Sequence, residues 1–451
     1  MVPLESLQSR MSARTPARIS ADEAAALVRQ GHWLDFGFGM GQPDAFDQAL
    51  AARDDLAGPV FIRAALSMRP RAVLAAAQVG RPFVWLNWHF TAIDRRAHDA
   101  GMAHYIPLNF GEAPDLYRRF IDPVDIAVVK CTERDAAGFF NFSGACTYHE
   151  ALLERARCVI VEVDHRLPRV RGPRNGVHES RVDFVLDSDG AGAPELGQGA
   201  PNEIDQRIAR HVAAHVEDGA CLQIGIGGLP NAVCDAILES GAKDLGVHTE
   251  MLVDGLMRLH QAGRVTGARK RNGIGRIIFT FAGGSAALNA FIDDHPDLES
   301  WPVDETNLPD RIMANPGVVS INSTAQMDLQ GQAGSESAGP RHLTGTGGQL
   351  QFVRGAYASP GGKSFLCLPS TRARRDGTVE SRIVPSLEPG TIVTTPRTDV
   401  MHVATEWGVV NLKGKSVPER ARALISVAHP DFRESLSRAA RDLRMAPAGF
   451  L

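Results

Sequence analysis

Short apolar runs alternate with amphipathic, helix-like segments along most of this 451-residue chain, and the alternation limits the folds that the chain can adopt. The runs are too short for buried helices and are typical of strands that are covered on both faces. Runs predicted to be buried strands lie at 127–129, 158–161, 221–224, 277–279 and 391–393. Strands that alternate with helices favour a mainly parallel sheet with helices packed against it, so the expected fold class is α/β.

The length of the chain fits two domains of roughly 200 residues each, which is ample for hydrophobic cores. A segment rich in Gly, Ala, Pro and Asp at 187–202 interrupts the alternation and is the predicted linker. We therefore expect a flexible N-terminal arm at 1–17, an N-terminal α/β domain at 18–186 and a C-terminal α/β domain at 203–451.

The two predicted domains share a partial internal repeat. In the first, a helix that opens with an S-x-x-E capping box ends at Gly31, and a strand then leads to the turn Gly37-Phe38-Gly39. In the second, a helix ends at Gly219, and a strand leads to the turn Gly225-Ile226-Gly227. The helix-ending glycine and the first turn glycine are six positions apart in both places, so duplication of one α/β unit is the natural explanation.

The second turn, Gly225-Ile226-Gly227-Gly228-Leu229, is a candidate binding site for a phosphate or a thioester oxygen. Glycines permit positive φ and carry no Cβ, so backbone N–H groups at a helix start can reach such a ligand. The turn is not a Walker loop, because no G-K-[ST] follows, and Pro230 replaces the third glycine of G-x-G-x-x-G. Dinucleotide binding stays an alternative, because Glu250 lies 25 positions after Gly225, near the spacing of a ribose-binding acid.

Glu250 is the candidate reactive carboxylate, because it lies between the apolar segments 245–247 and 251–253. A glutamate that is buried there without a partner has a raised pKa or a function. The alternative is a structural ion pair or an acid at a helix start. A second glycine cluster at 344–348 can supply more backbone donors over a long ligand, which favours the functional interpretation.

Composition and missing motifs exclude several classes of function. The 48 Lys and Arg nearly balance the 52 Asp and Glu, so neither nucleic acid nor an anionic membrane is an expected partner. No membrane span of roughly 20 apolar residues and no signal peptide are found, so a cytoplasmic location is expected. The six cysteines are scattered and are expected to be reduced, and no metal-ligand spacing occurs, so no metal site is predicted. G-x-S-x-G is also absent, which excludes a serine hydrolase of that type.

Several of these segments are similar to those of a known family. The turn G-I-G-G-L-P-N-A (225–232), the segment H-T-E-M (248–251), N-S-x-x-x-x-D-L-x-G-Q (322–332) and G-T-G-G-Q-x-x-F-V-R-G-A (345–356) resemble the acetyl-CoA hydrolase/transferase family. The resemblance is closest to its 4-hydroxybutyrate and butyrate:acetate CoA-transferase branch, and it covers nearly the whole chain. The family often has an Asp where this chain has Gln351 and an acid where it has Arg181.

The resemblance implies two related open α/β domains that arose by duplication of a CoA-transferase-like unit. It also implies that the active site lies in the cleft between the two domains. Carried over by motif, Glu250 is the nucleophile that forms a glutamyl-CoA thioester, the turn from Gly225 to Leu229 contacts CoA, and Asn322 and Gly345 are further CoA contacts. Coenzyme A and acyl-CoA are then substrates, together with a short-chain carboxylate, and no tightly bound cofactor is implied. A homo-oligomer, a dimer, is expected.

Alternatives stay open at this point. An acyl-CoA hydrolase would use the same glutamate with water as the acceptor. A dinucleotide-binding protein or a non-catalytic regulatory subunit would keep the glycine turns and need no reactive carboxylate. Glu336, among glycine and serine, is the alternative nucleophile and is expected on an exposed loop, whereas Glu406 is expected to be structural. The cluster Arg269-Lys270-Arg271 is expected to be a solvated basic loop.

Overall fold

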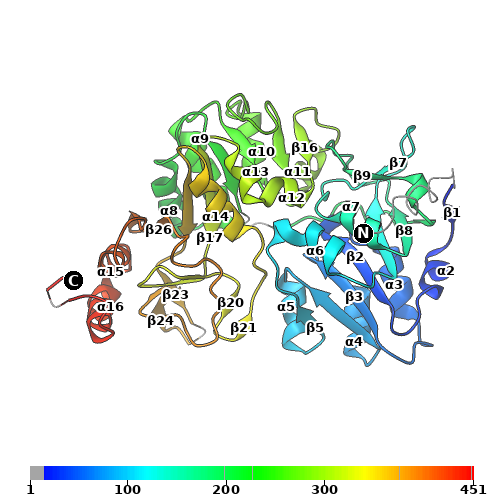
Figure 1. Ribbon diagram of the computed structural model, residues 1–451, viewed down its shortest axis with the longest axis horizontal. Coiled ribbons are helices and arrows are strands. Elements are labelled where there is room, and N and C mark those ends of the chain that lie inside the picture. Colours follow the sequence, from blue (N-terminus) through cyan, green and yellow to red (C-terminus); the bar gives the residue numbers. More distant parts are fainter. Residues whose placement is uncertain (1–14, 198, 226, 375, 448, 451) are drawn as a thin grey trace. The chain divides into compact units, whose positions relative to one another are not determined.

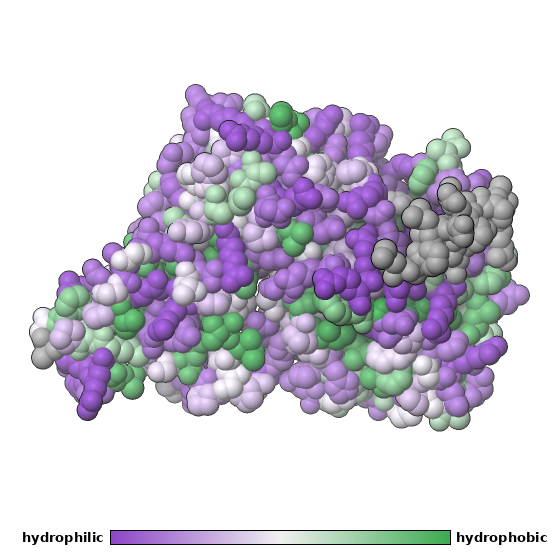
Figure 2. Space-filling view, viewed as in Figure 1, coloured by the Kyte–Doolittle hydropathy of each residue, from purple (hydrophilic) through white to green (hydrophobic). Residues whose placement is uncertain are grey.

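The computed structural model describes residues 15–450 apart from 198, 226, 375 and 448. The chain divides into two compact units, which are described separately below (Figure 1). Unit 1 is Met1–Leu196 with Thr280–Glu305, and unit 2 is Gly197–Phe279 with Thr306–Leu451. Figure 2 shows that hydrophilic residues cover most of the visible face, with smaller apolar groups between them. Within the described ranges, no helix is both long enough and apolar enough to span a membrane.

Unit 1 is built on an eight-stranded sheet in which every neighbouring pair is parallel. The strand order is β1 (Ala17–Arg18), β10 (Phe184–Asp187), β8 (Cys158–Val163), β6 (Ile126–Cys131), β2 (Trp33–Phe38), β3 (Val60–Ala65), β4 (Phe83–Asn87), β5 (Ala103–Tyr105). Its helices include α2 (Ala21–Ala26), α3 (Ala45–Ala52), α4 (Ala72–Gln78), α5 (Ala92–Asp99), α6 (Ala113–Arg119), α7 (His149–Arg155) and α11 (Ala286–Phe291). A small antiparallel pair, β7 (Phe139–Asn141) and β9 (Gly176–His178), lies outside the sheet.

The helix α2 begins with the expected capping box, in which Ser20 and Glu23 each bond the other's backbone N–H. It ends at Ala26, however, so the predicted helix that reaches Gly31 is too long. Gly31 instead lies in a turn with φ of 81°, a conformation that glycine adopts readily. The expected N-terminal arm is also too long by one residue, because Ala17 already pairs with Phe184 in the sheet.

Unit 2 contains a second sheet, which is parallel except for its last pair. Its strands follow in the order β14 (Ile277–Phe279), β12 (Gly246–His248), β11 (Cys221–Ile224), β17 (Val318–Ser323), β22 (Lys363–Cys367), β26 (His402–Thr405), β27 (Gly408–Asn411). Its helices include α8 (Glu203–Ala213), α9 (Gly228–Ser240), α10 (Asp254–Gln261), α13 (Pro309–Met313), α14 (Gln349–Ala358), α15 (Val417–Ser426) and α16 (Pro430–Asp442). Short strands β18 (Gln326–Asp328), β19 (Ala333–Gly334), β25 (Ile383–Val384), β20 (Ser337–Ala338), β21 (Arg341–His342), β23 (Thr371–Ala373) and β24 (Val379–Ser381) form smaller sheets.

The two sheets have the same topology. In each, the first long strand of the unit, β2 or β11, lies inside the sheet, and the next strands, β3 and β4 or β12 and β14, add on one side. The chain then crosses to the other side of the first strand with β6 and β8 or with β17 and β22. The expected fold class of two related open α/β units is therefore confirmed.

Two details of the predicted organisation differ in the structure. Residues 280–305, expected in the second domain, belong to unit 1, because backbone N–H groups at Ala282 and Ser300 bond carbonyl oxygens at 144 and 171 of that unit. The run 391–393 is not a buried strand, since Ile392 is 48% exposed. It follows Pro389-Gly390 and precedes Pro396, and proline cannot donate to a central ladder.

The turn after the central strand of unit 1 is closed by the protein's own side chains. The carboxylate of Glu162, on β8, accepts hydrogen bonds at 2.9–3.1 Å from the N–H groups of residues 44–46 at the start of α3. Nε2 of His149 accepts the N–H of Phe38 at 3.3 Å, and a Cβ at Gly37 would overlap the same ring. Burial raises the pKa of Glu162, and the three N–H groups oppose that rise. An anion site of the helix N-terminus type is thus already filled.

Replacing Glu162 by alanine should lower the stability of unit 1 by about 3 kcal/mol, because three buried N–H groups lose their acceptor. Urea unfolding followed by tryptophan fluorescence measures this, since Trp33, Trp85, Trp88 and Trp301 all belong to unit 1. Glu239→Ala, at an exposed position, is the control. Equal midpoints for the two variants would contradict the capping role of Glu162.

Candidate active site

The predicted site residues of unit 2 gather at the carboxyl ends of three adjacent parallel strands. Gly225 directly follows β11, Glu250 comes two residues after β12, and Asn322 lies near the end of β17. The N–H of Gly225 bonds the carbonyl oxygen of Ile321 at 3.2 Å, which fixes the turn beside β17. In open α/β sheets this edge is where ligands bind. The topology therefore brings together residues that are far apart in the sequence.

The carboxylate of Glu250 is held by two neutral donors. Nδ2 of Asn307 donates to its Oε2 at 2.5 Å, and the backbone N–H of Gly348 donates a second hydrogen bond. Removal of water by burial raises the pKa of Glu250 to about 7, although these two donors lower it. The residue is half-buried, so part of it still reaches solvent. With a pKa of about 7, such a glutamate is about half ionised at pH 7, and its ionised form is weakly solvated and can act as a nucleophile.

Gly348 is required to be glycine for steric reasons. A Cβ at this position would overlap Oε2 of Glu250 and Nδ2 of Asn307. Gly348 precedes α14 as its N-cap, so its N–H belongs to the group of unsatisfied donors at a helix start. The second glycine cluster therefore contacts Glu250 through Gly348, and this contact is possible because Gly348 has no side chain.

Glu336 is buried, and the expectation that it lies on an exposed loop is wrong. Its carboxylate accepts hydrogen bonds from Oγ1 of Thr346 at 2.9 Å and from Oγ1 of Thr394 at 3.0 Å. A further hydrogen bond stabilises the loop that carries Glu336, because Nε2 of Gln349 donates to Oγ of Ser335 at 2.9 Å. Glycine and serine neighbours suggested solvent, but the short strands around them enclose the carboxylate. Glu336 thus anchors the glycine cluster that ends at Gly348.

The turn between β11 and α9 keeps the features expected of a binding loop. Gly227 has φ of 124° and is the N-cap of α9, so its backbone conformation is one that side chains rarely adopt. Ile226 lies outside the described residues. Asn322 and Gln223 pair through their side-chain amides at 3.1 and 3.3 Å, and Gly345 is buried in the glycine cluster.

Other residues singled out from the sequence have structural environments. The carboxylate of Glu406 accepts hydrogen bonds from the backbone N–H and Oγ of Ser370, in line with the expected structural role. Lys270 is buried and donates to two backbone carbonyls, so the predicted solvated basic loop is wrong at this position. Gln351 is buried on α14, and Arg181 is exposed at the end of a short 3-10 helix.

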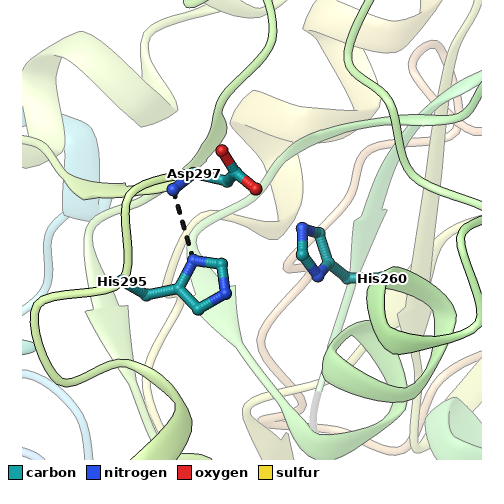
Figure 3. A group of neighbouring side chains, drawn as sticks. All are labelled: His260, His295 and Asp297. Atoms are coloured by element: carbon teal, nitrogen blue, oxygen red, sulfur yellow. Dashed lines mark hydrogen bonds between the residues drawn. The ribbon is translucent and has the colours of Figure 1, made fainter.

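Three side chains of metal-binding type are drawn in Figure 3, and they come from both units. His295 and Asp297 belong to unit 1, where the N–H of Asp297 donates to Nδ1 of His295 at 3.2 Å. His260 lies on α10 of unit 2. Across the described ranges, neither unit by itself brings three such side chains together.

Comparisons with known proteins identify the family of this chain. Residues 7–194 match the model of the acetyl-CoA hydrolase/transferase N-terminal domain, and residues 284–440 match that of the C-terminal domain. The chain is 42% identical to the butyryl-CoA:acetate CoA-transferase of Anaerostipes caccae over 419 residues, which are 92% of this chain and 94% of the relative. The chain belongs to the acetyl-CoA hydrolase/transferase family.

Further members of this family support the assignment. The chain is 37% identical to the 4-hydroxybutyrate coenzyme A transferase of Clostridium kluyveri, across 93% of this chain and 96% of that protein. The crystal structure of RipA from Yersinia pestis superposes with a TM-score of 0.86 at 36% identity, across 95% of this chain and 98% of RipA. The family and the enzyme class predicted from the motifs are confirmed.

Asn307 is the residue that the sequence did not reveal. It lies in the segment Asp304-Glu305-Thr306-Asn307, which has no glycine turn, no family motif quoted above and no unusual spacing. Only the folded chain shows that its amide reaches Glu250 across 57 positions of sequence.

Gly348→Ala should reduce the turnover of acyl-CoA by about 100-fold, because the added methyl group displaces the Glu250 carboxylate by an ångström or more. Steady-state kinetics of CoA transfer measures the loss. Gly197→Ala is the matched control, since no atom in the described part of the chain lies within 4 Å of a Cβ there. Near wild-type turnover of the Gly348 variant would show that the carboxylate does not need this position.

Proposed function

We propose that this protein is a CoA-transferase that moves CoA between short-chain carboxylates by a ping-pong route through a glutamyl-CoA thioester on Glu250. The observation that carries the proposal is the Glu250 carboxylate, held by Asn307 and Gly348 at the carboxyl edge of the unit 2 sheet with a pKa of about 7. The relatives named above as CoA-transferases, for butyrate and acetate and for 4-hydroxybutyrate, indicate acids of two to four carbons.

Each half of the proposed ping-pong reaction consists of two acyl substitution steps. The Glu250 carboxylate attacks the carbonyl carbon of the acyl-CoA, an O–C bond forms, and the C–S bond breaks to release CoA thiolate and leave an anhydride. The thiolate then attacks the glutamyl carbonyl carbon, the anhydride C–O bond breaks, and the first acid leaves as its carboxylate. The glutamyl-CoA thioester that results reacts with a second carboxylate by the same steps in reverse. No electron transfer is involved.

The donors already on Glu250 suit the second step. When thiolate attacks the glutamyl carbon, negative charge collects on the glutamyl oxygen, and the N–H of Gly348 and the amide of Asn307 are placed beside it. Removing one such preorganised donor costs about 2.7 to 4 kcal/mol in other enzymes. We assign the turn from Gly225 to Leu229 to CoA, as the family resemblance implies, with Asn322 and Gly345 as further contacts.

The contrast between the units supports the choice of unit 2. The turn of unit 1 has its helix start occupied by Glu162 and its glycine packed against His149. At the start of α9 in unit 2, the nearest atoms to a Cβ at Gly228 are backbone oxygens and the Asp205 carboxylate at 3.2–3.5 Å, and the corresponding strand β22 places no acid there. The second turn therefore lacks a counterpart of Glu162 on β22, whereas the first turn is filled, and this supports the assignment of CoA to the second turn.

A glutamyl-CoA adduct tests the proposal directly. Incubation with butyryl-CoA should add the mass of CoA less water to the wild-type chain, and the modified peptide should contain Glu250. Glu250→Ala should lose the adduct and the activity, whereas Glu336→Gln should keep the adduct, because Glu336 anchors a loop. An adduct on Glu336, or none on the wild type during turnover, would refute the assignment.

The same experiment distinguishes transfer from hydrolysis. A panel of acetate, butyrate, 4-hydroxybutyrate and succinate should consume the adduct far faster than water does. If water consumes it as fast as any acid, the protein is an acyl-CoA hydrolase that uses the same glutamate.

The rate should depend on pH through Glu250. Because only the ionised carboxylate attacks, and its pKa is about 7, kcat/KM should fall about tenfold per pH unit below 7 and level off above it. Initial rates with limiting butyryl-CoA between pH 5.5 and 8.5 measure the profile. A rate that stays constant down to pH 5.5 would mean that the attacking group has an ordinary carboxylate pKa.

A further inference from the structure

The side-chain amide of Asn307 must be oriented with Nδ2 toward Glu250 to donate its hydrogen bond. Its two ends have nearly the same shape, but Nδ2 donates to the Glu250 carboxylate, whereas Oδ1 in the same place would repel it. A flipped amide would remove a donor and bring a second acceptor to a half-buried carboxylate. Some neighbouring group must therefore hold Oδ1 on the other side.

Thr306 is that neighbour. Its Oγ1–H donates to Oδ1 of Asn307 at 2.9 Å, so the oxygen end of the amide is already engaged when the nitrogen end faces Glu250. Both Thr306 and Asn307 are fully buried, and water is therefore a poor substitute for either partner. A hydroxyl can donate in this position, whereas a methyl group of the same size cannot.

His248 fixes the backbone that carries Thr306. Its Nε2–H donates to the carbonyl oxygen of Thr306 at 2.9 Å, and burial lowers the pKa of His248 to about 3, so the ring is neutral with its proton on Nε2. His248 ends β12, two residues before Glu250. The hydrogen bonds thus form a closed path from β12 through Thr306 and Asn307 back to Glu250, all inside unit 2.

We propose that Thr306 is a positioning residue of the transferase reaction, whose hydroxyl holds the Asn307 amide with its N–H groups toward Glu250. The inference rests on the proposed function, because it concerns the donor for the glutamyl oxyanion. The Glu250 side chain changes from carboxylate to anhydride and thioester during turnover, and the hydrogen bond from Thr306 keeps the donor aimed while its partner changes.

Two variants of nearly equal size test the hydroxyl. Thr306→Val should lower kcat and the rate of glutamyl-CoA formation at least about tenfold, since one oriented donor is worth about 100-fold when it is removed entirely. The KM for butyryl-CoA should change less than about threefold, because CoA contacts lie elsewhere, and Thr306→Ser should restore most of the rate. Ser320→Ala is the control, since it removes a buried hydroxyl of unit 2 that has no hydrogen-bond partner among the described residues.

A double-mutant cycle decides whether Thr306 acts through Asn307. In an Asn307→Ala background, the Thr306→Val change should have almost no further effect on kcat, because the amide that it orients is gone. Full additivity of the two losses, or wild-type kcat in Thr306→Val, would overturn the proposal. If the valine variant does not fold, Thr306→Ala is compared in the same two backgrounds.

The outcome is separable from that of the proposed function. The adduct on Glu250 is sought in the wild-type chain, where Thr306 is unchanged. Failure to find the adduct would overturn the nucleophile, and with it the role assigned to Thr306. An adduct in the wild type together with unchanged kinetics in the Thr306 variants would overturn only the positioning role.

Discussion

The hydrogen bonds from Asn307 and Gly348 to Glu250 are the interactions on which the rest of the unit 2 site depends. A carboxylate in partly dehydrated surroundings is neutral unless donors keep it charged, and here both donors come from segments distant in sequence. The segments are fixed in turn by Thr306 and by Glu336, which bond the two loops rather than Glu250 itself. Satisfying one carboxylate therefore constrains three segments that are far apart in the sequence, around Glu250, Asn307 and Gly348.

Duplication explains where the site lies and why there is one turn for each unit. Both turns follow an equivalent strand, but in unit 1 the start of α3 bonds Glu162 and the first turn glycine packs against His149. The buried carboxylate accepts the N–H groups at the helix start, as a bound anion does at other helix N-termini. Unit 1 thus uses the inherited geometry for its own stability. In unit 2, strand β22 carries no acid that could fill the same place, and Glu250, the nucleophile that we propose, lies one strand away from the turn.

Much of this was accessible from sequence, because periodicity and glycine placement report on backbone geometry. Four of the five apolar runs are strands, the repeat reflects a real duplication, and Glu250 closely follows a strand, β12. What sequence missed depends on contacts between segments: Asn307 has no local signal, and Glu336 looks exposed until Thr346 and Thr394 close over it. The prediction of a buried strand at 391–393 was wrong for the same reason, because three apolar residues in sequence do not show whether they lie on the surface or in a sheet.

The kind of donor at Glu250 matters as much as its presence. In the described structure, burial raises the pKa of Glu250 and the hydrogen bonds from Asn307 and Gly348 lower it. Neither of these two donors carries a charge. A lysine or arginine in place of Asn307 would lower the pKa by about 1 to 3 units and stabilise the resting carboxylate, which weakens it as a nucleophile. Neutral donors hold the ground state less tightly and strengthen as charge concentrates on one oxygen in the tetrahedral intermediate. A pKa near neutrality is therefore the result expected when a carboxylate must be ionised, desolvated and still reactive.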